Sequence, residues 1–529
     1  MRTMYPNLDT IEEKRLLLQQ KLDTEKTSQQ RNILGQFATP TDLAIEILHY
    51  AQTLIPDSEP IRFLDPAFGT GAFYSALLRA FSTNQIERAW GFEVDQCYGE
   101  NAIKFWADDL LKLNLADFTK ATPPLEDNKK FNLVICNPPY VRHHHIDSDD
   151  KPRLRKLVQS YTNYRLNGLA GLYTYFMLLS QIWMSPNGLA GWLVPSEFLD
   201  VNYGKEVKRF LLKHVTLLQI HRFNPKQSQF DDALVSSVVV WFKNCPPKQD
   251  HPIKFSYGGQ LLAPEESTVV AAEKLTPNEK WTKLPLIGFR SKPHKNIEKK
   301  IKLSELFTIK RGIATGANKF FILTPEQVSQ FKLPEECLKP ILPSPRYLDQ
   351  FEIEADEYGL PKIRKLLFLL DCKLPESVVE QYYPSVWRYL QLGVEQGIHQ
   401  RYLSQHRSPW YAQEVRPPAP ILCTYMGRVN LTKENPFRFI MNKSRATAPN
   451  VYLLMYPKPA LDLQLKNNPD LLRLIWQEIR QISPIDLISE GRIYGGGLHK
   501  IEPNELANAA IRDVVGIDDF KDGLQLSMF

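Results

Sequence analysis

The feature that most constrains this chain is a short apolar run followed by a glycine-containing turn and an amphipathic helix. The run is 61–64, the turn is DPAFGTG (65–71), and 72–81 has helical periodicity. Two more apolar runs end in a polar residue, 89–92 before Glu93 and 131–136 before Asn137. Short buried strands that alternate with helices predict a parallel, doubly wound α/β sheet.

The same pattern sets the expected domain organisation. It continues to about residue 245, where the β-branched run 235–242 could close the sheet. The segment 244–254 is rich in proline and polar residues and is typical of a linker. Beyond it the strands become irregular and aromatic residues mix with Lys and Arg. We expect a helical extension at 1–35, an α/β domain at 36–245 and a separate mixed α/β domain at 255–529.

Composition narrows the class of protein. The chain has 529 residues, a formal net charge of +6 and six cysteines without a CxxC pair. Scattered cysteines in a long chain indicate reduced thiols and no structural zinc. No apolar run reaches the ~18 residues that a membrane span needs. We therefore expect a soluble, cytoplasmic protein with no metal and no membrane partner. A stretch at 280–319 holds eleven Lys and Arg against two Glu, which indicates a surface that faces nucleic acid.

The glycine turn predicts a cofactor site at the carboxyl end of the sheet. It is not GxGxxG, and only Gly69 and Gly71 allow close backbone approach. Asp65 offers an acceptor for an ammonium group, while the following helix N-terminus can meet a carboxylate. S-adenosylmethionine carries both charges on its methionine moiety. Glu93, 22 residues after Gly71, is expected to accept the ribose hydroxyls, and Asp108 to accept the adenine amine.

A second motif, Asn137-Pro138-Pro139-Tyr140, follows the buried run 131–136 and predicts the chemistry. Two prolines fix φ and present carbonyls rigidly. The Asn137 side-chain oxygen and the Pro138 carbonyl can then accept hydrogen bonds from one NH2 group. A conjugated amine needs this, because its lone pair is delocalised until the nitrogen is drawn toward sp3. Tyr140 can stack on a planar substrate.

In their order, these motifs resemble the gamma-class (Taq-type) adenine-N6 DNA methyltransferases of restriction–modification systems. The segments that carry the resemblance are QFATP (36–40), DPAFGTG (65–71), GFEVD (91–95), ADDL (107–110) and NPPY (137–140). The resemblance implies a Rossmann-like methyltransferase sheet followed by a target-recognition domain. One departure concerns Asp109, which stands where some relatives place an aromatic residue against the cofactor adenine.

The resemblance also implies roles for single residues. Thr39 would lie over the methionine moiety, and Phe176 would pack near the cofactor adenine. Phe230 would sandwich a flipped adenine with Tyr140. Further residues of the cofactor pocket would be Ala67, Val94 and Pro139.

The second domain would bind double-stranded DNA. The decapeptide 310–319 resembles the opening motif of the family's recognition domain, and Lys310, Arg311, Asn318 and Lys319 are its candidate DNA contacts. Arg142 is expected to contact phosphate. The adjacent His143, His144 and His145 cannot all face one metal from a regular element. We expect a monomer that protects DNA from a separately encoded restriction endonuclease.

Two alternatives stay open. Methylases of RNA and of glutamine side chains in proteins share NPPY, so the tetrapeptide does not by itself specify DNA. A DNA-binding specificity subunit with a silent methylase fold is the other possibility. The basic second domain favours DNA over protein as the substrate, and the intact NPPY and DPAFGTG argue against a silent fold.

Overall fold

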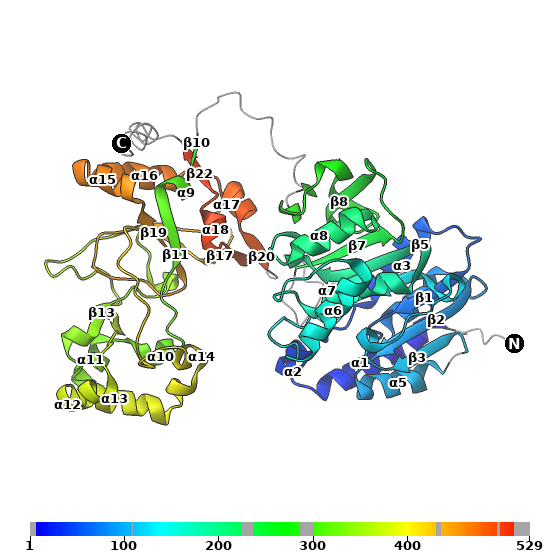
Figure 1. Cartoon of the computed structure of the whole chain (residues 1–529), viewed down its shortest axis with the longest axis horizontal. Coiled ribbons are helices and arrows are strands. Elements are labelled where there is room, and N and C mark those ends of the chain that lie inside the picture. Colours follow the sequence, from blue (N-terminus) through cyan, green and yellow to red (C-terminus); the bar gives the residue numbers. More distant parts are fainter. Residues whose placement is uncertain are drawn as a thin grey trace. The chain divides into compact units, whose positions relative to one another are not determined.

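The chain forms two compact units in the computed structural model, which describes residues 7–107, 109–224, 236–282, 284–285, 300–429, 435–494 and 498–512 (Figure 1). Unit 1 is built on Met1–Pro293, and unit 2 on His294–Ile493 together with Gly497–Phe529. Among the described residues, no helix is long and apolar enough to cross a membrane.

Unit 1 is organised on a nine-stranded sheet with the order β3-β2-β1-β4-β5-β7-β6-β8-β9. The five strands from β3 to β5 run parallel, and β7 is antiparallel to both of its neighbours. The strands are β1 (Ile61–Asp65), β2 (Ile86–Glu93), β3 (Leu111–Leu115), β4 (Phe131–Cys136), β5 (Met184–Pro195), β6 (Thr216–Arg222), β7 (Ser237–Lys243), β8 (Pro252–Gly259) and β9 (Pro264–Ala271). The predicted α/β class is therefore confirmed.

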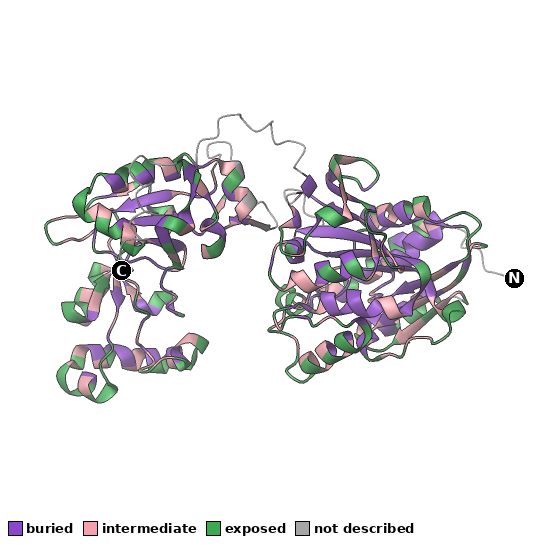
Figure 2. Cartoon of the chain, turned by 45° about the horizontal axis from the view of Figure 1, so that its top comes forward, coloured by how far each residue is buried: buried purple, intermediate pink, exposed green. Residues whose placement is uncertain are grey.

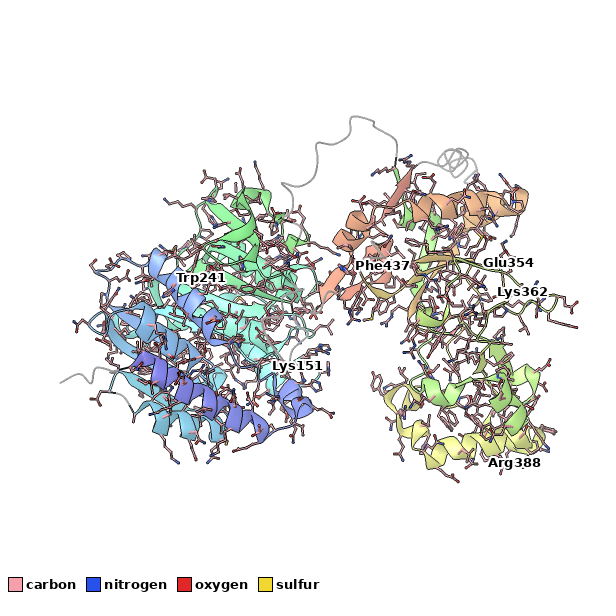
Figure 3. All side chains as sticks on the ribbon, turned by 180° about the vertical axis from the view of Figure 1, so that it is seen from behind. Lys151, Trp241, Glu354, Lys362, Arg388 and Phe437 are labelled. Atoms are coloured by element: carbon pink, nitrogen blue, oxygen red, sulfur yellow. The ribbon has the colours of Figure 1, made fainter. Side chains whose placement is uncertain are left out.

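Helices cover both faces of this sheet, and its central strands are buried (Figure 2). Successive residues of β4 enter different cores: Val134 belongs to the core that contains residues of α6, α7 and α8, and Leu133 to the core that contains residues of α3, α4 and α5. Trp241 of β7 is fully buried and lies 5.1 Å from Tyr50 of α3 between ring centroids (Figure 3). The helices are α1 (Leu8–Thr24), α2 (Ser28–Leu34), α3 (Thr41–Leu54), α4 (Ala72–Ala80), α5 (Gln96–Trp106), α6 (Asp150–Thr162), α7 (Leu172–Ser180) and α8 (Gly204–Lys213).

The structure corrects the predicted boundary between the domains. The segment 244–254 is not an interdomain linker, because β8 begins within it at Pro252 and, with β9, extends the same sheet. Residues 244–251 form the connection from β7 to β8. The run 235–242 does not close the sheet either, since β7 lies between β5 and β6. The predicted N-terminal extension is helical, as α1 and α2, and belongs to unit 1.

Unit 2 is a mixed α/β unit with a five-stranded sheet of order β11-β19-β16-β18-β14. Its strands are β11 (Phe307–Arg311), β14 (Glu352–Ile353), β16 (Ile421–Thr424), β18 (Phe439–Asn442) and β19 (Tyr452–Pro457). Smaller sheets contain β10 (Lys300–Lys302) with β22 (Ala510–Arg512), β12 (Ile322–Leu323) and β13 (Leu338–Pro340) with β15 (Phe368–Leu370), and β17 (Met426–Arg428) and β20 (Arg492–Tyr494) with β21 (Leu498–Lys500).

The helices of unit 2 pack around these sheets in three apolar cores. One core joins the five-stranded sheet to α16, where Trp476 donates a hydrogen bond from Nε1 to the Phe439 carbonyl at 3.2 Å. The helices are α9 (Leu303–Leu306), α10 (Asn318–Phe321), α11 (Pro325–Phe331), α12 (Glu376–Tyr382), α13 (Pro384–Glu395), α14 (Tyr402–Gln405), α15 (Pro459–Asn467), α16 (Leu471–Arg480), α17 (Pro484–Glu490) and α18 (Pro503–Leu506).

Candidate active site

A cavity of about 530 Å³ opens at the carboxyl ends of β1, β2 and β4. Ligands of open α/β sheets bind at this edge. The lining comes from the turn after β1, the loop after β2, the NPPY segment after β4, the loop before α3 and the start of α7. Of the predicted site residues, the cavity is lined by Ala67, Gly69, Glu93, Val94, Asn137, Pro139 and Phe176.

The turn after β1 is shaped by its glycines. Gly69 and Gly71 have φ of 57° and 88°, in the left-handed region that side chains disfavour. A Cβ at Gly71 would meet the indole of Trp106 and lie 2.8 Å from the Phe68 ring. A Cβ at Gly69 would meet nothing within 4 Å, because this residue faces the cavity. Gly71 therefore satisfies packing, and Gly69 leaves room for a ligand.

Asp65 lies beneath this turn. It is 1% exposed, and its carboxylate accepts a hydrogen bond from the Ala67 amide at 3.1 Å. Burial, with a smaller contribution from the nearby charge of Glu93, raises the pKa of Asp65 to about 8. Asp65 is absent from the described lining of the cavity, so its expected contact with an ammonium group remains a prediction.

Glu93 links two walls of the cavity. Its carboxylate oxygens accept hydrogen bonds from the amides of Gly69 and Asp95, both at 2.8 Å. Burial raises the pKa of Glu93, while the two backbone donors lower it. The side chain is thus held at the tip of β2, with the remaining lone pairs of a carboxylate available to donors in the cavity.

The side chain of Asn137 is fixed on one side and unsatisfied on the other. Its Nδ2 donates to the Phe37 carbonyl at 2.9 Å and to Thr39 Oγ1 at 3.0 Å. Its Oδ1 is buried and accepts no hydrogen bond from any described residue. A buried amide oxygen without a donor costs free energy unless a ligand supplies one. The site therefore presents a pre-oriented acceptor.

The segment 35–39 packs against the NPPY segment. The Gly35 carbonyl accepts a hydrogen bond from the Tyr140 amide at 3.0 Å. Gly35 has φ of 65°, and a Cβ there would lie 2.6 Å from the Val141 nitrogen. Only glycine fits this close approach without displacing the motif.

Two further members of the predicted catalytic set are buried. Pro138 is buried. The Tyr140 ring is 7% exposed, and its hydroxyl donates to the Leu193 carbonyl at 3.1 Å. Tyr140 is not among the described residues that line the cavity. Phe230 lies outside the described residues, so the expected sandwich of a flipped base stays a prediction.

The cavity has an acidic residue that the sequence analysis did not name. Asp108 lies outside the described residues, so its expected contact with the adenine amine stays a prediction. Asp117 follows β3 and lines the cavity with Phe118, whose ring centroid is 5.5 Å from that of Phe176. Asp117 accepts hydrogen bonds from the amide and hydroxyl of Thr119 at 2.9 and 2.8 Å.

The loop after NPPY carries the basic residues of this edge. Arg142 is exposed, and His145 lines the cavity. Burial, together with neighbouring positive charge, lowers the pKa of His143 and His144. Within the described part of the chain, no cluster of three His, Cys, Asp or Glu side chains could hold a metal ion.

Unit 2 has a cleft of its own, with a volume of about 660 Å³. Asn318 and Lys319, at the start of α10, line it together with Gln396, Arg401 and Asn450. None of its described lining residues is acidic. Lys310 and Arg311 end β11 and lie outside this lining. The Arg311 guanidinium stacks on the Tyr425 ring at 4.3 Å from its centroid.

Comparison with known proteins adds the family. The model of the Eco57I restriction-modification methylase matches residues 67–230, and that of the C-terminal domain of the Type II methyltransferase M.Eco57I matches 278–525. The two matched ranges together cover most of the chain. The chain belongs to the Eco57I restriction–modification methylases.

Relatives of this Eco57I-family methylase are similar along most of their length. Type II methyltransferase M.AccI of Acinetobacter calcoaceticus is 29% identical over 510 residues, which cover 92% of this chain and 87% of that protein. M.XamI of Xanthomonas campestris pv. amaranthicola is 26% identical over 491 residues, covering 90% and 85%. The solved structure of the Type IIL restriction-modification enzyme MmeI in complex with DNA has a TM-score of 0.52 at 12% identity, covering 88% of this chain and 64% of MmeI.

Several cavity residues of this Eco57I-family methylase escaped the sequence analysis. Asp117 and Phe118 follow β3, whose sequence LKLNL is polar enough to hide a strand. Gln19 of α1 also lines the cavity, although α1 lies outside both matched ranges. Its polar sequence gave no signal of packing against the α/β core. A search for strand-end acids after every short β-like run would have found Asp117.

Proposed function

We propose that this chain is an S-adenosylmethionine-dependent DNA methyltransferase that methylates N6 of an extruded adenine and acts in a restriction–modification system. The observation that carries the proposal is the buried Oδ1 of Asn137 at the cavity, which accepts no hydrogen bond from any described residue. Methyl transfer to an exocyclic amine requires an acceptor there, and the motif order and family support adenine as the target.

The residues around the cavity fit the chemistry of S-adenosylmethionine. Gly69 leaves open space at the turn, Glu93 offers a carboxylate for hydroxyl groups, and Phe118 and Phe176 offer flat apolar contacts for a purine. Asp117 offers an acceptor for the adenine amine. When bound, S-adenosylmethionine supplies a methyl group on a sulfonium, which is a good leaving group.

The protein's own groups would activate the target. Asn137 Oδ1 and the Pro138 carbonyl accept hydrogen bonds from the target NH2, which draws its lone pair out of the conjugated ring. Held in this way, the target nitrogen would take the methyl group that the bound cofactor supplies in place of one proton, which would leave to solvent. Alignment dominates this reaction, since no strong base is needed. The contacts of Asn137 with Phe37 and Thr39 supply that alignment.

Unit 2 would supply the contact with DNA. The cleft has no acidic residue in its described lining, and it carries the side-chain amides of Asn318, Gln396 and Asn450 and the cations of Lys319 and Arg401. Amides and guanidinium groups are the usual readers of base edges, and lysines neutralise phosphate. We propose that this rim, with Lys310, Arg311 and the loop residue Arg142, faces the duplex.

Transfer of labelled methyl groups tests the activity. Full-length protein is incubated with labelled S-adenosylmethionine and duplex DNA, RNA or a protein mixture, and the modified nucleoside is identified by mass spectrometry. We expect N6-methyladenine in DNA. Asn137→Ala should retain cofactor binding and lose transfer. Label in RNA or protein would move the substrate to those classes, whereas DNA binding without transfer would indicate a silent specificity subunit.

The DNA-facing role of unit 2 has its own test. Lys319→Gln should weaken DNA binding and lower the slope of affinity against salt by about one, because one phosphate contact is lost. Lys362, which is exposed on a loop of unit 2 away from the described lining of the cleft, provides the control Lys362→Gln (Figure 3). Equal effects of the two substitutions would reject the cleft as the DNA-facing surface.

A further inference from the structure

Helix α1 packs against the protein mainly through polar side chains: its buried residues are Glu12, Arg15, Gln19 and Leu22. Glu12 and Arg15 are 5% and 1% exposed, and Gln19 is also buried. Leu17, on the other face, is 66% exposed. A surface helix normally buries its apolar stripe. Because three of the four buried residues of α1 are polar, specific polar contacts, and not hydrophobic burial alone, hold the helix in place.

The centre of these contacts is a buried ion pair. Arg15 donates to both carboxylate oxygens of Glu12, from Nε at 2.8 Å and from Nη2 at 2.5 Å. Ser75 Oγ, on α4, donates to Glu12 Oε2 at 2.6 Å. Thr41 Oγ1, at the start of α3, donates to Glu12 Oε1. Burial raises the pKa of Glu12, but the hydrogen bonds and charge of Arg15 outweigh it and leave the pKa below its ordinary value.

The ion pair reaches the glycine turn through Thr70. Arg15 Nη1 donates to Thr70 Oγ1 at 2.9 Å, and that hydroxyl donates in turn to Gln19 Oε1 at 2.6 Å. The Thr70 carbonyl accepts from Trp106 Nε1 at 2.9 Å. Thr70 lies between Gly69 and Gly71 but is not among the described residues that line the cavity. Its side chain is therefore used to hold the turn, not to contact a ligand.

The far end of α1 makes a second set of contacts, at the start of α5. Asp23 accepts a hydrogen bond from the Tyr98 hydroxyl at 2.5 Å. Lys26, just after α1, pairs with Asp95, which also accepts from Gln36 Nε2 at 3.0 Å. Asp95 and Tyr98 both line the cavity. One helix thus spans from the turn after β1 to the loop after β2.

A buried ion pair is a poor means of gaining stability alone. The desolvation of two charges can exceed their attraction, and apolar replacements of similar volume are often equally stable. The two parallel hydrogen bonds to Glu12, however, hold the Arg15 guanidinium in one orientation, so that its bond to Thr70 has a fixed direction as well as a fixed length. The ion pair is therefore better suited to fixing the position of the glycine turn than to stabilising the fold.

We propose that α1 is a clamp on the cofactor site, in which Glu12, Arg15 and Gln19 are positioning residues for the glycine turn and Lys26 is one for the loop after β2. This inference rests on the proposed function, because the ligand of the turn is taken to be S-adenosylmethionine. The clamp fixes the spacing between the parts of the cavity that hold the methionine and ribose moieties.

The test measures cofactor affinity and turn mobility separately. In full-length protein, Arg15→Met removes the guanidinium group. Thr70→Val removes the hydroxyl that this group holds and keeps the shape of the side chain. We expect each variant to bind S-adenosylmethionine about tenfold more weakly by calorimetry, as is typical when a group that orients a binding residue is lost. Hydrogen exchange at the amides of 69–71 should be faster in the cofactor-free variants than in the cofactor-free wild type.

Matched variants complete the design. Arg15→Lys keeps the charge and should recover part of the affinity. The double variant Glu13→Gln with Lys14→Met changes exposed residues of the same helix and should bind within twofold of wild type. If Arg15→Met does not fold, Thr70→Val decides the matter. Folded Thr70→Val with unchanged affinity and exchange overturns the clamp, whereas a wild type that does not bind S-adenosylmethionine overturns the proposed function.

Discussion

Thr39 is the residue at which cofactor contact and catalytic alignment can be told apart. The resemblance to Taq-type enzymes predicts that Thr39 lies over the methionine moiety. The structure gives its hydroxyl another partner, Nδ2 of Asn137 at 3.0 Å. Thr39→Val removes this acceptor with little change in volume, and Thr39→Ser retains it.

The size of the effect follows from the hydrogen bonds of Asn137. After the substitution Nδ2 keeps only the Phe37 carbonyl, so one N–H of a part-buried amide is left without a partner. Such a loss costs about 1–3 kcal/mol. If the amide rotates to relieve it, Oδ1 leaves the productive direction. At about 1.4 kcal/mol per tenfold in rate, kcat should fall about 5- to 150-fold.

Two measurements decide the outcome. Single-turnover methylation at saturating DNA and cofactor gives the rate of transfer, and calorimetry gives the Kd of S-adenosylmethionine. We expect Thr39→Val to lower the rate and leave the Kd within twofold, with Thr39→Ser close to wild type. An unchanged rate would refute the alignment role. A raised Kd that accounts for the whole loss would favour the methionine contact instead.

Three further substitutions test the geometry of the site. Gly35→Ala should reduce kcat on the order of 100-fold while S-adenosylmethionine still binds, because the new Cβ displaces the NPPY backbone; normal turnover by this variant would contradict the close approach. Glu93→Gln should weaken S-adenosylmethionine binding about tenfold in calorimetry, because the NH2 group of the new glutamine would face a backbone N–H of Gly69 or Asp95. Unchanged affinity would speak against the role of the carboxylate. Burial raises the folded-state pKa of Asp65 from 3.8 to about 8. Between about pH 4 and pH 8 the folded protein therefore holds a proton that the unfolded chain has released. The free energy of unfolding falls as pH rises through this window. Asp65→Asn has no carboxyl to titrate, so its stability should not fall in this way. The melting temperature of the variant minus that of the wild type should therefore increase from pH 4 to pH 8. A constant difference would argue against a neutral buried carboxyl.

The parts of the fold that could be predicted are the buried strands whose sequence is a continuous apolar run. The predicted strand 131–136 matches β4 at both ends, and the strand predicted at 61–64 ends one residue short of β1. Glu93 and Asn137 follow such runs directly, and both line the cavity. A strand end is thus a strong guide to a site when the strand itself is buried on both faces.

The misses have physical reasons as well. β3 is an edge strand with Lys112 and Asn114, so its β character is weak in sequence and Asp117 was passed over. Helix α1 packs through polar side chains, and hydrophobic periodicity cannot reveal such an interface. The proline-rich 244–254 has the composition of a linker, although its neighbours on both sides belong to one sheet.

The position of β8 determines where a shortened form of the protein could end. Gln219 and His221 of β6 share hydrogen bonds with the Ser256 hydroxyl of β8, at 2.8 and 2.9 Å, and all three side chains are buried. Farther along, Thr282 donates a hydrogen bond to Asp200 at 2.8 Å. A fragment cut at the apparent linker would keep the cofactor turn and the NPPY segment and still strip these polar groups of their partners. The functional motifs therefore mark the chemistry of unit 1 but not its smallest foldable length, which should extend at least to residue 285.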